Sequence, residues 1–109
     1  MTSTSTQGSI ILISSMSSLI VNRPQPQAAY NASKAAVAHL ARSLAVELAP
    51  HGIRVNSLAP GYMNTPLLQA IIAKGGEEYT RYWKDGSPMN RLGQPEDLRG
   101  MPPVLVADV

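Results

Sequence analysis

Two short apolar runs and one long amphipathic segment stand out in the pattern of hydrophobic and polar positions. The run at residues 9–14, Ser-Ile-Ile-Leu-Ile-Ser, follows Gly8 and ends in a series of serines. A continuous β-branched apolar run of this length predicts a strand that is buried on both faces, as in a parallel sheet. The run at residues 53–58, Ile-Arg-Val-Asn-Ser-Leu, predicts a second strand.

The segment from about residue 28 to residue 49 predicts a long amphipathic helix, because its apolar positions recur at the helical period of 3.6 residues. The expected core-facing stripe consists of Val37, Leu40, Ala41, Leu44, Ala45 and Leu48. Pro50-His51-Gly52 should end this helix. Strand, helix and strand in this order predict a βαβ unit with parallel strands.

The remaining segments predict connections and short helices. Residues 22–27 contain Pro24 and Pro26 and should form an irregular connection. Residues 65–87 predict one or two short helices that could cover a site, with a break near Gly75-Gly76. Residues 94–98 are typical of a helix start, but Gly100 and Pro102-Pro103 should soon interrupt that helix.

The carboxyl ends of the two predicted strands carry residues suited to a ligand site. Serines occupy four of the five positions from 14 to 18, and Ala59-Pro60-Gly61 follows the second strand. Ligands of open α/β sheets bind outside the carboxyl ends of the strands. Gly61 would let a ligand approach the backbone closely, and Pro60 would stiffen that wall. The alternative is that these are turn and capping residues, which we favour for Ser17 and Ser18.

Tyr30 and Lys34 form a candidate acid–base pair. Four residues apart on a helix, they would lie on one face with their Cβ atoms about 5–6 Å apart. A fixed ammonium beside a phenol favours the phenolate, so the pair could move a proton near neutral pH. The spacing alone is weak, because it also fits an amphipathic helix with a half-buried tyrosine and a solvated lysine.

The composition indicates one small globular domain and excludes several classes of site. The chain has 109 residues, of which 44% are hydrophobic and 15% charged. We expect a polar tail at residues 1–8 and the domain at residues 9–109. The absence of cysteine excludes disulfides, thiol catalysis and cysteine zinc sites, and the two histidines are isolated, so we expect no metal.

The charge and hydropathy patterns predict neither a nucleic-acid nor a membrane partner. The net charge is +2, and the nine lysines and arginines are scattered instead of forming a basic stripe. The longest unbroken apolar run covers residues 10–13, far short of the roughly 20 residues that span a bilayer. Residues 1–8 lack the charged region of a secretory signal. We therefore expect a cytoplasmic protein.

Taken together, four ordered motifs resemble those of short-chain dehydrogenases/reductases over about residues 8 to 100. The serine-rich strand end, the Asn-Arg-Pro-Gln-Pro-Gln lead-in and the Trp83 region are most similar to the fungal polyol and ketose reductases, of the sorbose reductase and mannitol or arabinitol dehydrogenase types. The resemblance implies a partial doubly wound, Rossmann-type parallel sheet. The motifs are Ile13-Ser14-Ser15, residues 30–36 (YNASKAA), residues 53–61 (IRVNSLAPG) with Thr65, and residues 91–98 (RLGQPEDL).

The resemblance also implies a role for each motif residue. Tyr30 would be the general acid in carbonyl reduction and the base in alcohol oxidation. Lys34 would make the phenol more acidic and hydrogen-bond the nicotinamide ribose. Ser15 would hold the substrate oxygen, although it precedes Tyr30 by fifteen residues, slightly more than is commonest in the family, so Ser17 stays a rival. Pro60, Gly61 and Thr65 would line the cofactor.

The reaction implied is hydride transfer between NADP or NAD, with NADP as the first expectation, and the carbonyl or alcohol of a sugar or polyol. A full-length member would be a homo-oligomer. The family's glycine-rich cofactor fingerprint and its catalytic asparagine have no counterpart here, so we expect the carboxyl-terminal half of a domain, truncated at both ends. The alternative is a non-catalytic remnant or interaction module.

Overall fold

The computed structural model describes residues 7–23, 25–71, 73 and 77–106. The predicted tail at residues 1–8 and the predicted break at Gly75-Gly76 thus lie largely outside the described residues. The molecule is elongated, with extents of 52 × 27 × 24 Å. In chain order, its elements are β1 (Gly8–Ile13), the 3₁₀ turn η1 (Met16–Ser18), α1 (Ala28–Leu48), η2 (Ala49–His51), β2 (Ile53–Leu58), α2 (Pro66–Ile71), α3 (Glu77–Asp85), η4 (Pro95–Leu98) and α4 (Met101–Val106).

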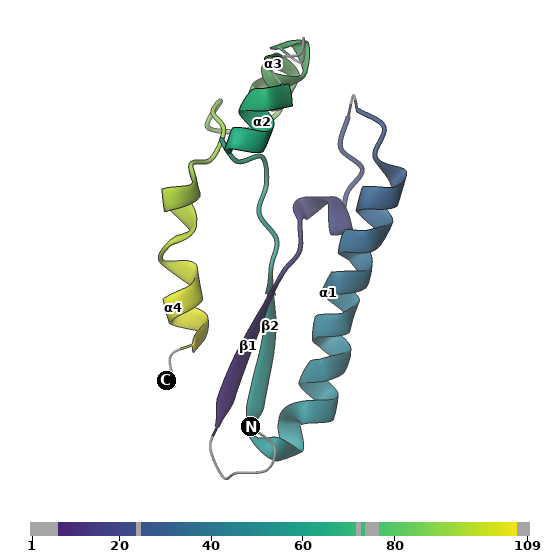
Figure 1. The fold of residues 1–109 in the computed structure, drawn as a ribbon, viewed down its shortest axis with the longest axis vertical. Coiled ribbons are helices and arrows are strands. Elements are labelled where there is room, and N and C mark those ends of the chain that lie inside the picture. Colours follow the sequence, from purple (N-terminus) through teal and green to yellow (C-terminus); the bar gives the residue numbers. More distant parts are fainter. Residues whose placement is uncertain (1–6, 24, 72, 74–76, 107–109) are drawn as a thin grey trace.

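The predicted βαβ unit is confirmed. Strands β1 and β2 pair in parallel, with Gly8 opposite Ile53 and Ile13 opposite Leu58. Helix α1 lies alongside the two strands and returns the chain to their starting end (Figure 1). Gly52 makes the tight turn into β2 with a φ of 72°, in the left-handed region that glycine adopts without strain. Because the strands are parallel, their carboxyl ends meet at one edge of the sheet.

The main core lies between α1 and the sheet. Ala41, Ile53 and Val55 are buried there, and five half-buried residues pack against them. The small side chain of Ala41 lets the helix approach β2 closely. The five half-buried residues are Ile10, Leu12, Leu44, Ala45 and Leu48. With Ala41, four of the six predicted stripe residues therefore belong to this core. The prediction that Leu40 faces the core is wrong. Half of its surface is exposed, because its side of α1 turns away from both strands.

The prediction that β1 is buried on both faces is wrong for this chain. Its residues are half-buried from Gly8 to Leu12, and Ile13 is exposed. The sheet has two strands within the described residues, so each strand has one edge without a neighbouring strand. A continuous apolar run reports that a strand is suited to burial, but the burial itself depends on the layers around it.

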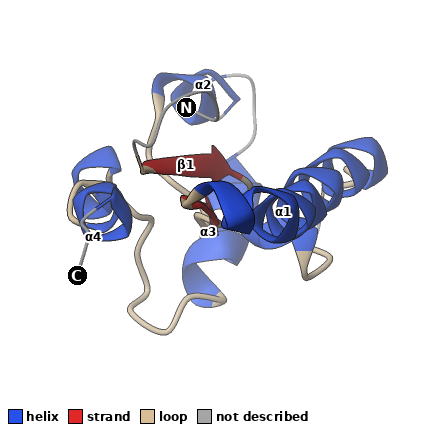
Figure 2. Ribbon diagram, turned by 90° about the horizontal axis from the view of Figure 1, so that it is seen from below, coloured by secondary structure: helices blue, strands red, loops and turns tan. Residues whose placement is uncertain are grey.

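Helix α4 covers the side of the strands opposite α1 (Figures 1 and 2). The Ser9 hydroxyl and the Arg54 guanidinium both donate to the carbonyl oxygen of Leu105, at 3.2 and 2.8 Å. The helix that starts at residues 94–98 is interrupted, as predicted, and a new helix follows it. The first, η4, ends at Leu98, and α4 starts at Met101. Pro102 and Pro103 lie in the first turn of α4, where a backbone N–H would have no helical partner anyway.

Residues 59–93 build a smaller unit beyond the carboxyl ends of the strands, with α2 and α3 at its outer side (Figure 1). Two short helices are thus present where one or two were predicted. Leu68, Trp83 and Leu92 form the second core, with Tyr62 packed against it. Met63 and Gly93 pair as an isolated bridge. A Cβ at Gly93 would lie 2.7 Å from the sulfur of the flexible Met63 side chain, which would have to move aside.

Candidate functional site

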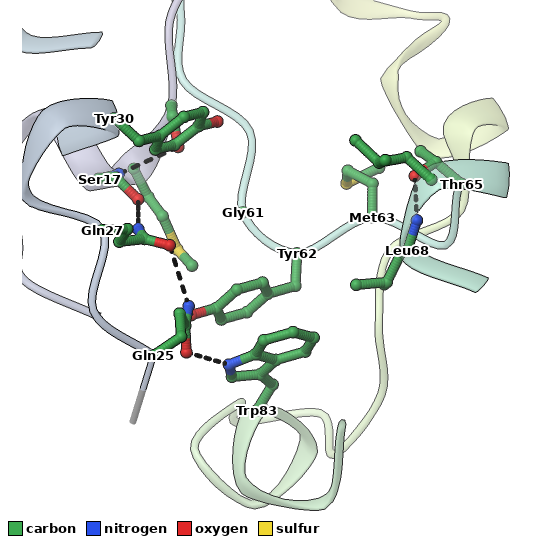
Figure 3. Close-up of a pocket in the computed structure, with 13 residues that line it drawn as sticks. Ser17, Gln25, Gln27, Tyr30, Gly61, Tyr62, Met63, Thr65, Leu68 and Trp83 are labelled. Atoms are coloured by element: carbon green, nitrogen blue, oxygen red, sulfur yellow. Dashed lines mark hydrogen bonds between the residues drawn. The ribbon is translucent and has the colours of Figure 1, made fainter. Parts of the chain in front are cut away.

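A pocket of about 470 Å³ opens beyond the carboxyl ends of β1 and β2. Figure 3 shows side chains from the β1–α1 connection on one side of it and from the segment after β2 on the other. Trp83 of α3 lies below them. The lining residues are Ser15, Met16, Ser17, Gln25, Gln27, Tyr30, Gly61, Tyr62, Met63, Thr65, Leu67, Leu68 and Trp83.

Tyr30 and Lys34 lie together in the first two turns of α1, as the spacing predicts. The Lys34 Nζ is 5.8 Å from the centre of the Tyr30 ring. It also donates to the carbonyl oxygen of Ile13, the last residue of β1, at 3.4 Å. Tyr30 lines the pocket, is about half exposed, and its hydroxyl has no hydrogen-bond partner among the described residues. The phenol is therefore free to bond to a ligand oxygen.

Three buried serines follow the end of β1, and the first of them, Ser14, connects the strand to this pair. The Ser14 hydroxyl donates to the main-chain oxygen of Lys34 at 2.9 Å and fixes α1 against the strand end. Ser15 lines the pocket and caps η1, because its Oγ accepts the Ser17 N–H at 3.1 Å. Ser15 thus keeps its O–H and one lone pair for a ligand.

Ser17 is held differently from Ser15. Its Oγ accepts the side-chain amides of Asn22 at 2.6 Å and of Gln27 at 2.9 Å. Both lone pairs are thereby occupied, so Ser17 could only donate to a ligand. The expectation that Ser17 is a turn residue agrees with its place in η1, although it also lines the pocket.

Some residues after β2 line the pocket, and others hold the lining in place. Gly61 and Thr65 line the pocket, whereas Pro60 and Lys34 are not among its lining residues. The Pro60 carbonyl accepts the Met16 N–H at 3.0 Å and so ties the two strand ends together. A Cβ at Gly61 would lie 3.4 Å from the Met16 sulfur. The Thr65 hydroxyl accepts the Leu68 N–H at 3.3 Å and starts α2.

Sequence reasoning missed Gln25 and Tyr62 in the polar and aromatic part of the pocket, whereas Trp83 belongs to the segment 65–87 that was expected to cover a site. The Tyr62 and Trp83 rings stack with their centres 4.3 Å apart and an interplanar angle of 16°. Gln25 bonds to both, at 2.9 Å to the Tyr62 hydroxyl and 3.1 Å to the Trp83 indole nitrogen. Burial raises the pKa of Tyr62, an effect that the Gln25 hydrogen bond opposes. For Tyr62 the one available signal was its position directly after Gly61.

The described residues give no support for other kinds of site. They contain no group of three or more histidine, cysteine, aspartate or glutamate side chains that could hold a metal ion. None of the helices in this part of the chain is both long and apolar enough to cross a bilayer.

Comparison with known sequences identifies related proteins. The family described as enoyl-(acyl carrier protein) reductase matches residues 1–109. A D-arabinitol 2-dehydrogenase (ribulose-forming) of Candida tropicalis is 52% identical over 101 residues, which are 93% of this chain and 36% of that protein. A galactitol 2-dehydrogenase of Rhizobium johnstonii is 53% identical over 84% of this chain and 35% of its own length. A sorbose reductase of Candida albicans is 50% identical over 85% of this chain and 32% of its own length. The chain thus spans about a third of the length of these relatives.

Solved structures agree with this family and with its fold. A short-chain type dehydrogenase/reductase from Mycobacterium marinum superposes with a TM-score of 0.86 at 44% identity, over 94% of this chain and 39% of that one. A gluconate 5-dehydrogenase from Burkholderia cenocepacia in complex with NADP and tartrate has a TM-score of 0.82 at 34% identity, over 93% and 38%. An NAD⁺-bound xylitol dehydrogenase has a TM-score of 0.79 at 27% identity, over 92% and 42%. The βαβ unit is therefore part of a Rossmann-type sheet, and the chain belongs to the short-chain dehydrogenase/reductase family.

Proposed function

We propose that this chain provides the proton-transfer and substrate-binding part of an NAD(P)-dependent oxidoreductase that interconverts the carbonyl and alcohol forms of a polyol or ketose. One observation carries the proposal. The Tyr30 phenol, which has no hydrogen-bond partner among the described residues, faces a pocket at the carboxyl edge of the sheet and has the Lys34 ammonium beside it. The named activities of the relatives, on arabinitol, galactitol and sorbose, support the substrate class.

In this proposal Tyr30 gives its proton to the substrate oxygen during reduction and takes it back during oxidation. Lys34, with its Nζ 5.8 Å from the ring centre, places a positive charge beside the phenol that gives up the proton. The hydrogen bond from its Nζ to Ile13 holds the ammonium at the strand end. General acid–base catalysis by such a group contributes about 10²- to 10⁴-fold to a rate.

Ser15 is the serine that we propose to hold the reacting oxygen. The oxygen of an alcohol both donates and accepts, whereas a carbonyl oxygen only accepts. Ser15 keeps an O–H and a lone pair and suits both forms. Ser17 has both lone pairs occupied by Asn22 and Gln27 and suits only the carbonyl. Asn22 and Gln27 then keep η1, and with it Ser15, in place.

The residues present fit a nicotinamide cofactor at this edge. The Lys34 ammonium has three donors and uses one on Ile13, so two are left for ribose hydroxyls. Gly61 exposes backbone in the pocket wall, and we propose that Tyr30, Pro60 and Thr65 complete the binding surface. The cofactor would supply or accept the hydride. We propose NADP before NAD, because two of the three solved relatives that name a bound cofactor carry NADP and one carries NAD⁺. A 50% identical L-xylulose reductase is named as NADH-dependent, so the assays below include both cofactors.

Turnover is the first test. The 109-residue chain is assayed for NADPH oxidation, followed by absorbance, when sorbose or ribulose is added, and we expect turnover once a cofactor-binding half is supplied. The same assay is run on a grafted relative, defined as the Candida tropicalis D-arabinitol 2-dehydrogenase in which this chain's sequence replaces the 101 matched residues. Circular dichroism of both proteins reports their folding. Absence of NADPH and NADH oxidation in both folded proteins would refute the proposed function.

A second candidate function is association through the outer side of α1, and a specific observation favours it. Leu40 is 50% exposed on this helix, which is apolar surface that a second copy could cover. We propose homo-oligomerisation on this basis. Light scattering after size-exclusion chromatography should then show an oligomer that Leu40→Asp dissociates, with Arg42→Asp as the matched surface control. An unchanged mass for Leu40→Asp would reject this interface.

A further inference from the structure

The orientation of the Gln25 side-chain amide is fixed by its aromatic neighbour. An indole N–H can only donate, so the Gln25 oxygen must face Trp83, at 3.1 Å from its Nε1. The amide nitrogen then faces the other way. It donates to the Tyr62 hydroxyl oxygen at 2.9 Å and to the Oε1 of Gln27 at 3.2 Å. Both amide hydrogens are thus used, and Gln25 has a defined direction.

This direction leaves the hydroxyl hydrogen of Tyr62 without an acceptor. Because Gln25 donates to the Tyr62 oxygen, the phenol does not donate back to it. No other acceptor for that hydrogen exists among the residues that the structure describes. A phenol that accepts one bond still has one O–H to donate, and the lining of the pocket includes Tyr62.

The Tyr62 ring is held rigidly enough to direct that hydrogen. It stacks on Trp83, which is only 6% exposed, and its main-chain oxygen accepts the Gly93 N–H at 2.9 Å. Figure 3 shows Tyr62 on top of Trp83, next to Gly61 and on the side of the indole toward Tyr30. Burial raises the pKa of Tyr62, so the phenol keeps its proton at neutral pH. Tyr62 is thus a fixed donor in the pocket.

We infer that Tyr62 is a specificity-determining residue whose hydroxyl donates a hydrogen bond to a hydroxyl oxygen of the polyol or ketose substrate, and that Gln25 is the positioning residue that turns this hydroxyl toward the substrate. The inference rests on the proposed function, because it names a second contact in the same pocket. Tyr30 moves the proton at the reacting carbon, whereas Tyr62 recognises another oxygen of the same molecule. A simple ketone without hydroxyl groups would gain nothing from Tyr62.

Two substitutions test this role separately. Tyr62→Phe removes the donor and keeps the ring that stacks on Trp83. Gln25→Glu keeps an acceptor for Trp83 but removes both amide hydrogens, so the Tyr62 O–H turns to the carboxylate and away from the substrate. Loss of one uncharged hydrogen bond corresponds to a rise in KM of about 3- to 10-fold. We expect this rise for sorbose with each variant, and no larger rise when the two are combined.

The assay uses the 109-residue chain and the grafted relative, with sorbose and with cyclohexanone as a ketone that lacks hydroxyls. We expect kcat, the KM for NADPH and the KM for cyclohexanone to change less than about twofold, because one neutral hydrogen bond to sorbose is all that is lost. Tyr82→Phe is the matched control, since Tyr82 lies outside the lining of this pocket. The emission of Trp83, the one tryptophan of the chain, reports whether the stacked pair persists.

An unchanged KM for sorbose in Tyr62→Phe, or an equal rise for cyclohexanone or NADPH, would overturn the inference. If Tyr62→Phe does not fold, Gln25→Glu decides alone by the same criteria. Absence of turnover in every unsubstituted protein is a different outcome, because it removes the proposed function and with it this role.

Discussion

Tyr30→Phe is expected to lower kcat of the grafted relative with sorbose by about 10²- to 10⁴-fold, the contribution of a general acid–base group. The substitution removes one oxygen from a side chain that is about half exposed, and that oxygen has no partner among the described residues. Neither core cluster includes Tyr30, so folding should be unaffected. The measurement is the initial rate of NADPH oxidation at saturating sorbose, with circular dichroism as the folding check.

A control on the same protein separates chemistry from binding. Fluorescence titration should give nearly the same dissociation constant for NADPH in the Tyr30→Phe variant as in the parent, because the phenol is only one of several proposed contacts. Tyr82→Phe, which removes the hydroxyl of an exposed tyrosine on α3, should retain full activity. A Tyr30→Phe variant with more than about a tenth of the parent rate would be incompatible with general acid–base catalysis by this residue.

Lys34→Met is the second large effect, with an expected loss in kcat of about 10- to 100-fold. The substitution keeps the length and helix propensity of the side chain but removes the ammonium beside Tyr30 and its bond to Ile13. The main-chain oxygen of Lys34 stays available to Ser14, so α1 should remain fixed to the strand end. The KM for NADPH should also rise, because the proposed ribose donors are lost.

Lys34→Arg distinguishes charge from geometry. It retains a positive charge but replaces a compact ammonium with a planar guanidinium. We expect intermediate activity, above Lys34→Met and below the parent, in the same NADPH assay. Equal activity of the Lys34→Met variant and the parent would show that Tyr30 works without this cation.

The Tyr30–Lys34 pair and the two strand ends could be predicted because each depends on local sequence. A spacing of four residues on a helix brings two side chains to one face, and strand ends follow from where apolar runs stop. The lining of the pocket by Ser15 and Gly61 follows from the parallel topology, whereas Thr65 was expected only from the family resemblance. The catalytic roles assigned to these residues remain predictions until the variants are measured.

The contacts within the aromatic part of the pocket could not be predicted in the same way. Gln25 and Trp83 are 58 positions apart, and their hydrogen bond depends on how α3 packs beyond the strands. The periodicity of apolar residues in the sequence does not predict a contact between two such distant segments. The exposure of Leu40 has a related cause, since a helical stripe defines a face but not how much of it the neighbouring strands cover.

The central claim is that Tyr30 gives the proton to the carbonyl oxygen while the cofactor gives a hydride to the carbonyl carbon in this pocket, and isotope transfer tests it most directly. The grafted relative and its Tyr30→Phe variant are incubated with sorbose and NADPH that carries deuterium at the transferable position, and the polyol product is analysed by mass spectrometry and NMR. The account predicts one deuterium at the reduced carbon with the parent and about 10²-fold or more less product with the variant in the same time. Equal deuterium incorporation by the two proteins, or unlabelled polyol from the parent, would contradict it.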